Sequence, residues 1–177
     1  MGEVVQRRSI TGFHLGPGGN PTGIGDYMRQ LDEAGVPFVI KTVDHYGYIY
    51  EATQVMDARA ASGKPAIKNI LIFRVSDKHN PGDDYKYDTP PYKDPLYVDD
   101  PEGGAEMHWG KTVAKLPPEF DKSRVILEVM NEVDKNYSEW LARFCVKIAE
   151  LAKRDGYMVS FLSWSSGEPE PKHWEGP

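Results

Sequence analysis

The sequence is poor in cysteine, in positive charge and in long apolar runs, and each shortage excludes a class of protein. Cys145 stands alone, so the 177 residues can form neither an internal disulfide framework nor a site built from several cysteines. The formal net charge of -6 argues against nucleic acid and anionic membranes as partners, because both select basic surfaces. No run of about 18 apolar residues is present to span a bilayer. The first ten residues lack a secretory signal, so we expect a soluble protein whose localisation stays unknown.

The sequence also lacks the spacings that hold metals and nucleotides. Its five histidines are scattered, and segment 77–84 does not place oxygen ligands at the intervals of a calcium loop. The glycine-rich segment 16–23, GPGGNPTG, has Pro21 where a dinucleotide fingerprint needs its third glycine. It is followed by Ile24, where a phosphate loop needs lysine. We therefore expect no metal and no cofactor.

What the sequence does have is a regular alternation of apolar runs and amphipathic segments. The pattern predicts strands at 9–15, 36–41, 66–74, 124–130 and 157–163, and helices at 23–34, 49–62, 105–115 and 137–154. A long proline-rich segment, 77–104, separates the third strand from the third helix. Connections of that length are commonly functional or mobile.

This order of elements predicts an α/β fold with parallel strands covered by helices. Two architectures fit: a (β/α)8 barrel of the TIM-barrel type with only strands 1 to 5 present, and an open doubly wound parallel sheet. A barrel needs roughly 250 residues, so length favours the open sheet for a complete protein. We favour a piece of a larger barrel, in which residues 1–177 form a single β/α domain, an incomplete barrel that could associate through its exposed strand edges; the open sheet is the alternative.

Polar or ionisable residues follow every predicted strand, and in both architectures ligands bind at the carboxyl ends of the strands. The residues at these ends are His14, Lys41–Asp44, Arg74–Asp77, Asn131–Glu132 and Ser163–Ser165. Aromatic residues such as Tyr87, Tyr92, Trp109 and Trp164 lie in or near the connections. They can either fill the core under loops or line a groove that stacks sugar rings.

Two carboxylates, Glu128 and Glu132, lie within and directly after the fourth predicted strand. Because side chains alternate along a strand, Glu128 and Glu132 are predicted to share one face. Buried carboxylates are costly unless they are paired or used, and Lys41 and Arg74 at neighbouring strand ends are natural counter-charges. Two interpretations stay open: a structural ion pair, or a carboxyl group at a pocket mouth that gives and takes a proton near neutral pH.

The segment 127–134, LEVMNEVD, resembles the fourth-strand signature of the clan A glycoside hydrolases, which are β/α barrels. The resemblance implies that Glu132 is the general acid/base, that Asn131 binds the sugar 2-hydroxyl and that Glu128 is a supporting residue. Val133 departs from the proline usual in that family. A retaining mechanism also needs a nucleophile. In that clan it is a glutamate after the seventh strand, which would lie outside this chain.

We therefore expect a glycoside hydrolase-like protein that acts on or binds a polysaccharide. Beside Asn131, the predicted substrate-binding residues are His14, Lys41, Arg74 and Trp164. The full-length parent is expected to be a glycosidase and this chain alone to be inactive. Two alternatives stay open: a non-catalytic carbohydrate-binding or structural β/α domain, and an open-sheet protein that binds a nucleotide over segment 16–23.

Overall fold

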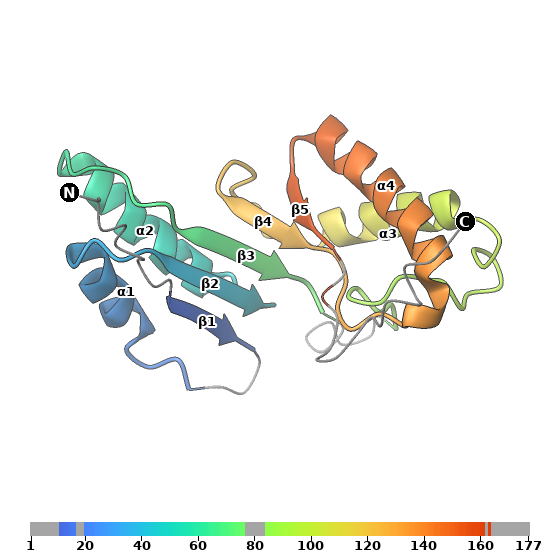
Figure 1. The fold of residues 1–177 in the computed structure, drawn as a ribbon, viewed down its shortest axis with the longest axis horizontal. Helices are drawn as coiled ribbons and strands as arrows, with labels where there is room; N and C mark the ends of the chain where they lie inside the picture. Colours follow the sequence, from blue (N-terminus) through green and yellow to red (C-terminus); the bar gives the residue numbers. More distant parts are fainter. Residues whose placement is uncertain (1–10, 17–19, 77–83, 162, 164–177) are drawn as a thin grey trace, which may run out of the picture. The chain divides into compact units, whose positions relative to one another are not determined.

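Strands and helices alternate along the chain in the computed structural model, which describes residues 11–16, 20–76, 84–161 and 163 (Figure 1). By their internal contacts the residues group into two units, Met1–Phe73 and Arg74–Pro177. The strand pairs within both units are parallel. The predicted α/β class with parallel strands is therefore confirmed. None of the described helices is both long and apolar enough to cross a bilayer.

Unit 1 contains β1 (Thr11–Leu15), α1 (Ile24–Glu33), β2 (Phe38–Val43), α2 (Gly47–Ala61) and β3 (Ile70–Arg74), whose last residue is grouped with unit 2. β1 runs parallel to β2, with Thr11 opposite Phe38 and Leu15 opposite Thr42. Helix α1 packs against α2, and α2 packs on β2 (Figure 1). The core of this unit consists of fully buried apolar side chains, among them Met28, Phe38, Ile40 and Ile49.

Unit 2 contains α3 (Pro101–Ala114), β4 (Val125–Glu128), a 3-10 turn η1 (Lys135–Tyr137), α4 (Ser138–Asp155) and β5 (Met158–Ser160). β4 runs parallel to β5, and Glu128 lies opposite Ser160. Helices α3 and α4 lie side by side (Figure 1). The apolar periodicity of segment 137–154 predicts one buried stripe on α4. Five of its residues are buried, Leu141, Phe144, Ile148, Leu151 and Ala152, and Cys145 on the same stripe is half-buried. Gly156 ends α4 in the left-handed conformation that glycine adopts without strain.

The structure corrects several predicted boundaries. Helix α3 begins at Pro101, four residues before the predicted 105, because Asp100 caps it by accepting a 3.0 Å hydrogen bond from the N–H of Gly103. Proline at the first helical position suits such a start. β4 ends at Glu128 and β5 at Ser160, both earlier than predicted. Apolar residues continue beyond both strands, so the sequence pattern alone made the two strands too long.

Candidate functional site at the end of β4

The chain stops being a regular strand after Glu128, three residues before the Asn131–Glu132 pair. Val129 and Met130 are buried, and Asn131 forms an isolated parallel bridge with Ser163. Glu132 then adopts a positive φ of 47°. Because the alternation of a strand requires extended backbone, the prediction that Glu128 and Glu132 share one strand face is wrong.

Glu128 is the buried carboxylate of the site, with 2% of its surface exposed. Its Oε1 lies 3.6 Å from Nη1 of Arg74 and accepts a hydrogen bond from the Ser163 hydroxyl. An unpaired carboxylate at this depth would cost several kcal/mol. Of the two interpretations left open by the sequence, the structural ion pair is present for Glu128, and its partner is Arg74 rather than Lys41.

Arg74, which is 7% exposed, ends β3 and faces a second carboxylate. Oδ2 of Asp88 lies 4.0 Å from Nε of Arg74. Nε and Nη1 of Arg74 make no hydrogen bond within the described part of the chain, so both contacts are ionic. Asp88 comes from the long proline-rich segment, and nothing in the sequence pattern singled it out.

Asn131 and Glu132 are placed by their backbone N–H groups. The N–H of Asn131 donates to the carbonyl oxygen of Asp88 at 2.8 Å, and the N–H of Glu132 donates to the carbonyl oxygen of Ser163 at 2.7 Å. The Glu132 residue is exposed and Asn131 is half-buried. No side-chain hydrogen bond or ion pair holds either residue among the described residues, so both polar groups can serve a ligand.

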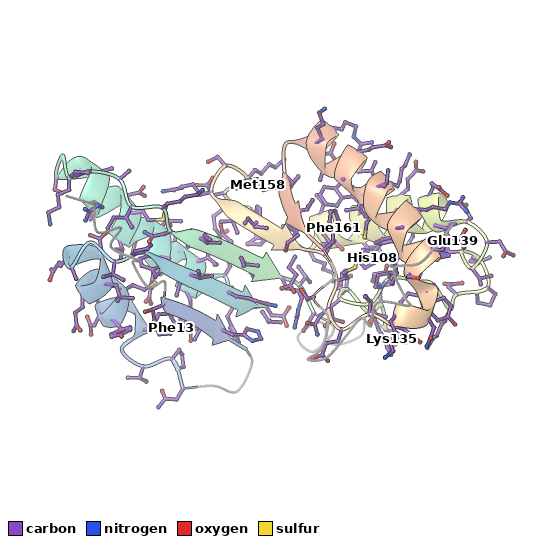
Figure 2. All side chains as sticks on the ribbon, viewed as in Figure 1. Phe13, His108, Lys135, Glu139, Met158 and Phe161 are labelled. Carbon is purple, nitrogen blue, oxygen red and sulfur yellow. The ribbon has the colours of Figure 1, made fainter. Side chains whose placement is uncertain are left out.

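His108 of α3 is fully buried in unit 2 and contacts the backbone directly after β4 (Figure 2). Its Nε2 lies 3.0 Å from the carbonyl oxygen of Val129, and its Nδ1 lies 2.6 Å from the hydroxyl oxygen of Tyr85. A carbonyl can only accept, so Nε2 carries the proton and Nδ1 accepts from Tyr85. Burial lowers the pKa of His108 to about 4, although the hydrogen bond to Val129 opposes that shift. The ring is therefore neutral at pH 7. Sequence reasoning missed it, because one histidine in a helix carries no spacing signal.

Two of the predicted substrate residues, His14 and Lys41, belong to unit 1, where they lie opposite each other on β1 and β2. His14, Asn20, His45 and Tyr48 help to line a pocket of about 210 Å³ in that unit. Asp44, directly after β2, has a positive φ of 62°, and the N–H of His45 donates to Val43 across it at 2.8 Å. Trp164 lies outside the described residues.

Four aromatic residues in or near the connections take the first of the two roles expected of them, that of filling the core. Tyr46, Tyr87, Tyr92 and Trp109 are buried, so these four fill the core. Tyr137 is half-buried and stacks on Tyr92, with 4.6 Å between ring centroids. The Tyr92 hydroxyl accepts a 3.4 Å hydrogen bond from the N–H of Asp134, two residues after Glu132.

Among the described residues, no group of three or more histidine, cysteine, aspartate or glutamate side chains is arranged to hold a metal ion. The glycine-rich segment proposed for a nucleotide is described only at Gly16 and from Asn20 to Gly23. Gly23 precedes α1 in a left-handed conformation and offers no side-chain cap.

Comparison of the chain with protein-family models, curated proteins and solved structures found no match. The resemblance to the clan A glycoside hydrolases therefore rests on the motif at residues 127–134 and, loosely, on the order of the elements.

Proposed function

We propose that unit 2 carries the acid/base half of a retaining glycoside hydrolase site. In this proposal Glu132 is the acid/base, Asn131 binds the sugar 2-hydroxyl, and the nucleophile comes from residues outside this chain. The ligand is a polysaccharide, and strands 1 to 5 are the front part of a β/α barrel.

One observation carries the proposal: Glu132, four residues beyond the carboxyl end of β4, is exposed in a conformation that glutamate rarely adopts. Such a backbone costs on the order of 1–3 kcal/mol and persists where the surrounding structure holds it. Here two neighbouring backbone N–H groups, those of Asn131 and Glu132, are both fixed by carbonyl oxygens. Strained residues of this kind gather at functional sites.

The chemistry would use Glu132 twice. As a carboxylic acid it gives its proton to the leaving glycosidic oxygen while the nucleophile forms a bond to the sugar. As a carboxylate it then takes a proton from the water that releases the sugar. The Asn131 amide would hold the 2-hydroxyl, where a hydrogen bond gains strength in the transition state.

Glu128 is the less suitable carboxylate for that work. It is buried and already accepts a hydrogen bond from Ser163 beside Arg74. A general acid must reach the leaving oxygen within hydrogen-bond distance, and the exposed Glu132 meets that need better. Glu128 is therefore assigned a supporting role.

The test is an NMR titration of the ¹⁵N-labelled chain with cello-, manno- and xylo-oligosaccharides. Binding of one of them should shift the amide signals of Asn131 and Glu132. Glu132→Ala should weaken that binding, and Glu139→Ala, which truncates an exposed glutamate on α4, should not. Binding that leaves Asn131 and Glu132 unshifted, or that Glu132→Ala does not change, contradicts the proposal. So does a complete absence of binding.

A hydrolysis assay tests the assigned chemistry. With the nucleophile outside the chain, we expect no turnover of the oligosaccharide that binds. Turnover that survives Glu132→Gln unchanged would remove Glu132 from the acid/base role. Non-catalytic binding, the alternative to catalysis, predicts that a longer parent protein also binds the sugar without turnover.

A further inference from the structure

The two residues proposed to act on the sugar are held by backbone bonds to residues distant in the sequence. Asn131 is bound to the carbonyl of Asp88 at 2.8 Å, and Glu132 is bound to the carbonyl of Ser163 at 2.7 Å. Glu132 lies beyond the regular β4–β5 pairing, which ends at Glu128 and Ser160. The placement of the pair therefore depends on what fixes Asp88 and Ser163.

The side chains of both acceptor residues lead to one guanidinium group. The Asp88 carboxylate lies 4.0 Å from Nε of Arg74. The Ser163 hydroxyl donates to Glu128, whose Oε1 lies 3.6 Å from Nη1 of Arg74. Arg74 is thus shared by two sets of contacts, which we call arms. The Asn131 arm runs through Asp88 to the N–H of Asn131, and the Glu132 arm runs through Glu128 and Ser163 to the N–H of Glu132.

We propose that Arg74 is the positioning residue of the Asn131–Glu132 pair, acting through Asp88 on one arm and through Glu128 and Ser163 on the other. This inference rests on the proposed function for its catalytic meaning. Its structural content, the coupling of Arg74 to two specific backbone N–H groups, can be tested without any sugar.

Charge and burial support a positioning role over a purely stabilising one. Arg74 and Glu128 are each more than nine-tenths buried, and a buried ion pair is often no more stable than apolar side chains of the same volume. The charged guanidinium of Arg74 can instead fix positions, because it attracts the carboxylates of Asp88 and Glu128, which belong to different segments. The strained φ of Glu132 needs such a fixed surrounding.

The network also has two arms that can be cut separately. Ser163→Ala removes one hydroxyl from the Glu132 arm and leaves every charge in place. Asp88→Asn removes the charge from the Asn131 arm and leaves Glu128 and Ser163 intact. Arg74→Lys keeps the charge but replaces the guanidinium with a compact ammonium group, which affects both arms.

The experiment is native-state hydrogen exchange of the full chain, followed by NMR at single amides. Ser163→Ala should speed exchange at Glu132 about tenfold and leave Asn131 within about twofold, because the opening is local. Asp88→Asn should give the reverse pattern, and Arg74→Lys should speed exchange at both amides. The amide of Ile148, in the core of α4, reports global unfolding. In each variant its exchange rate should change less than that of the amide expected to respond.

A matched control is Arg143→Lys, at an exposed ion pair between Arg143 of α4 and Glu102 of α3 with 2.7 Å between its charged atoms. It should leave both amides unchanged. Exchange that rises equally at Asn131, Glu132 and Ile148 in Ser163→Ala and Asp88→Asn would show a merely structural role and overturn the inference. These two variants decide the matter even if Arg74→Lys does not fold.

Sugar binding separates this inference from the proposed function. If an oligosaccharide binds at Asn131 and Glu132, Ser163→Ala should weaken it about three- to tenfold through the displaced N–H of Glu132. Arm-specific exchange without any sugar binding would overturn the proposed function and leave the coupling to Arg74 standing. Sugar binding with no arm-specific exchange would overturn the role of Arg74 and leave the proposed function standing.

Discussion

The N–H of Glu132 donates a 2.7 Å hydrogen bond to the carbonyl oxygen of Ser163, which joins the proposed acid/base to the segment after β5. The same Ser163 donates its hydroxyl to the buried Glu128. One residue therefore contacts both glutamates of the β4 region, the buried one through its side chain and the exposed one through its backbone. The stability of this network and the geometry of the candidate site should change together.

Removing the guanidinium of Arg74 should destabilise the protein strongly. Arg74→Met removes the guanidinium that lies beside the buried Glu128 and beside Asp88, and we expect the free energy of unfolding to fall by about 3–5 kcal/mol. Urea titration measures the change. The exposed pair of Arg143 and Glu102 provides the control, because Arg143→Met removes only a solvent-screened charge and should cost far less. Equal losses in the two variants would contradict the account of Arg74.

The burial of His108 should make stability fall in mild acid. At pH above 6.5 the ring is neutral whether the chain is folded or unfolded. Below that pH the unfolded chain binds a proton, but the folded chain does not until about pH 4, because burial lowers the pKa of His108. Folding should therefore lose about 3 kcal/mol between pH 6.5 and 4.

His108→Gln isolates this contribution from that of the carboxylates. The stability advantage of the wild type over the variant should shrink by about 3 kcal/mol between pH 7 and pH 4 in urea titrations at each pH. An advantage that stays constant over this range would show that His108 does not remain neutral in the folded protein.

Phe144 should be a main contributor to the packing of α4. Its ring is fully buried and stacks on Trp140, and it also contacts the ring of His108. We expect Phe144→Ala to lower the free energy of unfolding by about 3–5 kcal/mol. Val146→Ala, at an exposed position of the same helix, should change it by less than about 0.5 kcal/mol. Similar costs at the two positions would contradict this packing.

Glycine at position 132 should stabilise the fold and remove the site. Glycine adopts a positive φ freely, so Glu132→Gly should raise the free energy of unfolding by about 1 kcal/mol. Glu150→Gly, inside α4, should lower it by about 1 kcal/mol. Thermal or urea unfolding gives both values. A loss of stability in Glu132→Gly would mean that its φ of 47° carries no strain.

The sequence pattern was sufficient for the order of the elements, because features such as the apolar stripe of α4 follow from local periodicity. It offered Lys41 and Arg74 as counter-charges for the glutamates, and only the structure selects Arg74 as the partner of Glu128. The turn at Glu132 could not be predicted, because nothing in the local sequence marks its positive φ, and its N–H bonds to Ser163 far along the chain. The resulting exposure of Glu132, not the predicted shared strand face, is what makes it available to a ligand.

Asp88 and His108 could not be predicted for a related reason. Each reaches the end of β4 through tertiary structure, one from a proline-rich segment and the other from α3. Their residue types are common and their neighbours in the sequence carry no motif. Only the folded chain brings them to the carbonyl and N–H groups that flank the candidate pair.

The most direct test of the central claim is a double-mutant cycle between Asn131 and the sugar 2-hydroxyl. The affinities of wild type and Asn131→Ala are measured for the oligosaccharide that binds and for its 2-deoxy form. A single hydrogen bond predicts that wild type loses about five- to tenfold in affinity without the 2-hydroxyl, while Asn131→Ala binds both sugars equally. If Asn131→Ala still prefers the 2-hydroxy sugar as strongly as wild type does, Asn131 does not bind that hydroxyl and the proposed site is wrong.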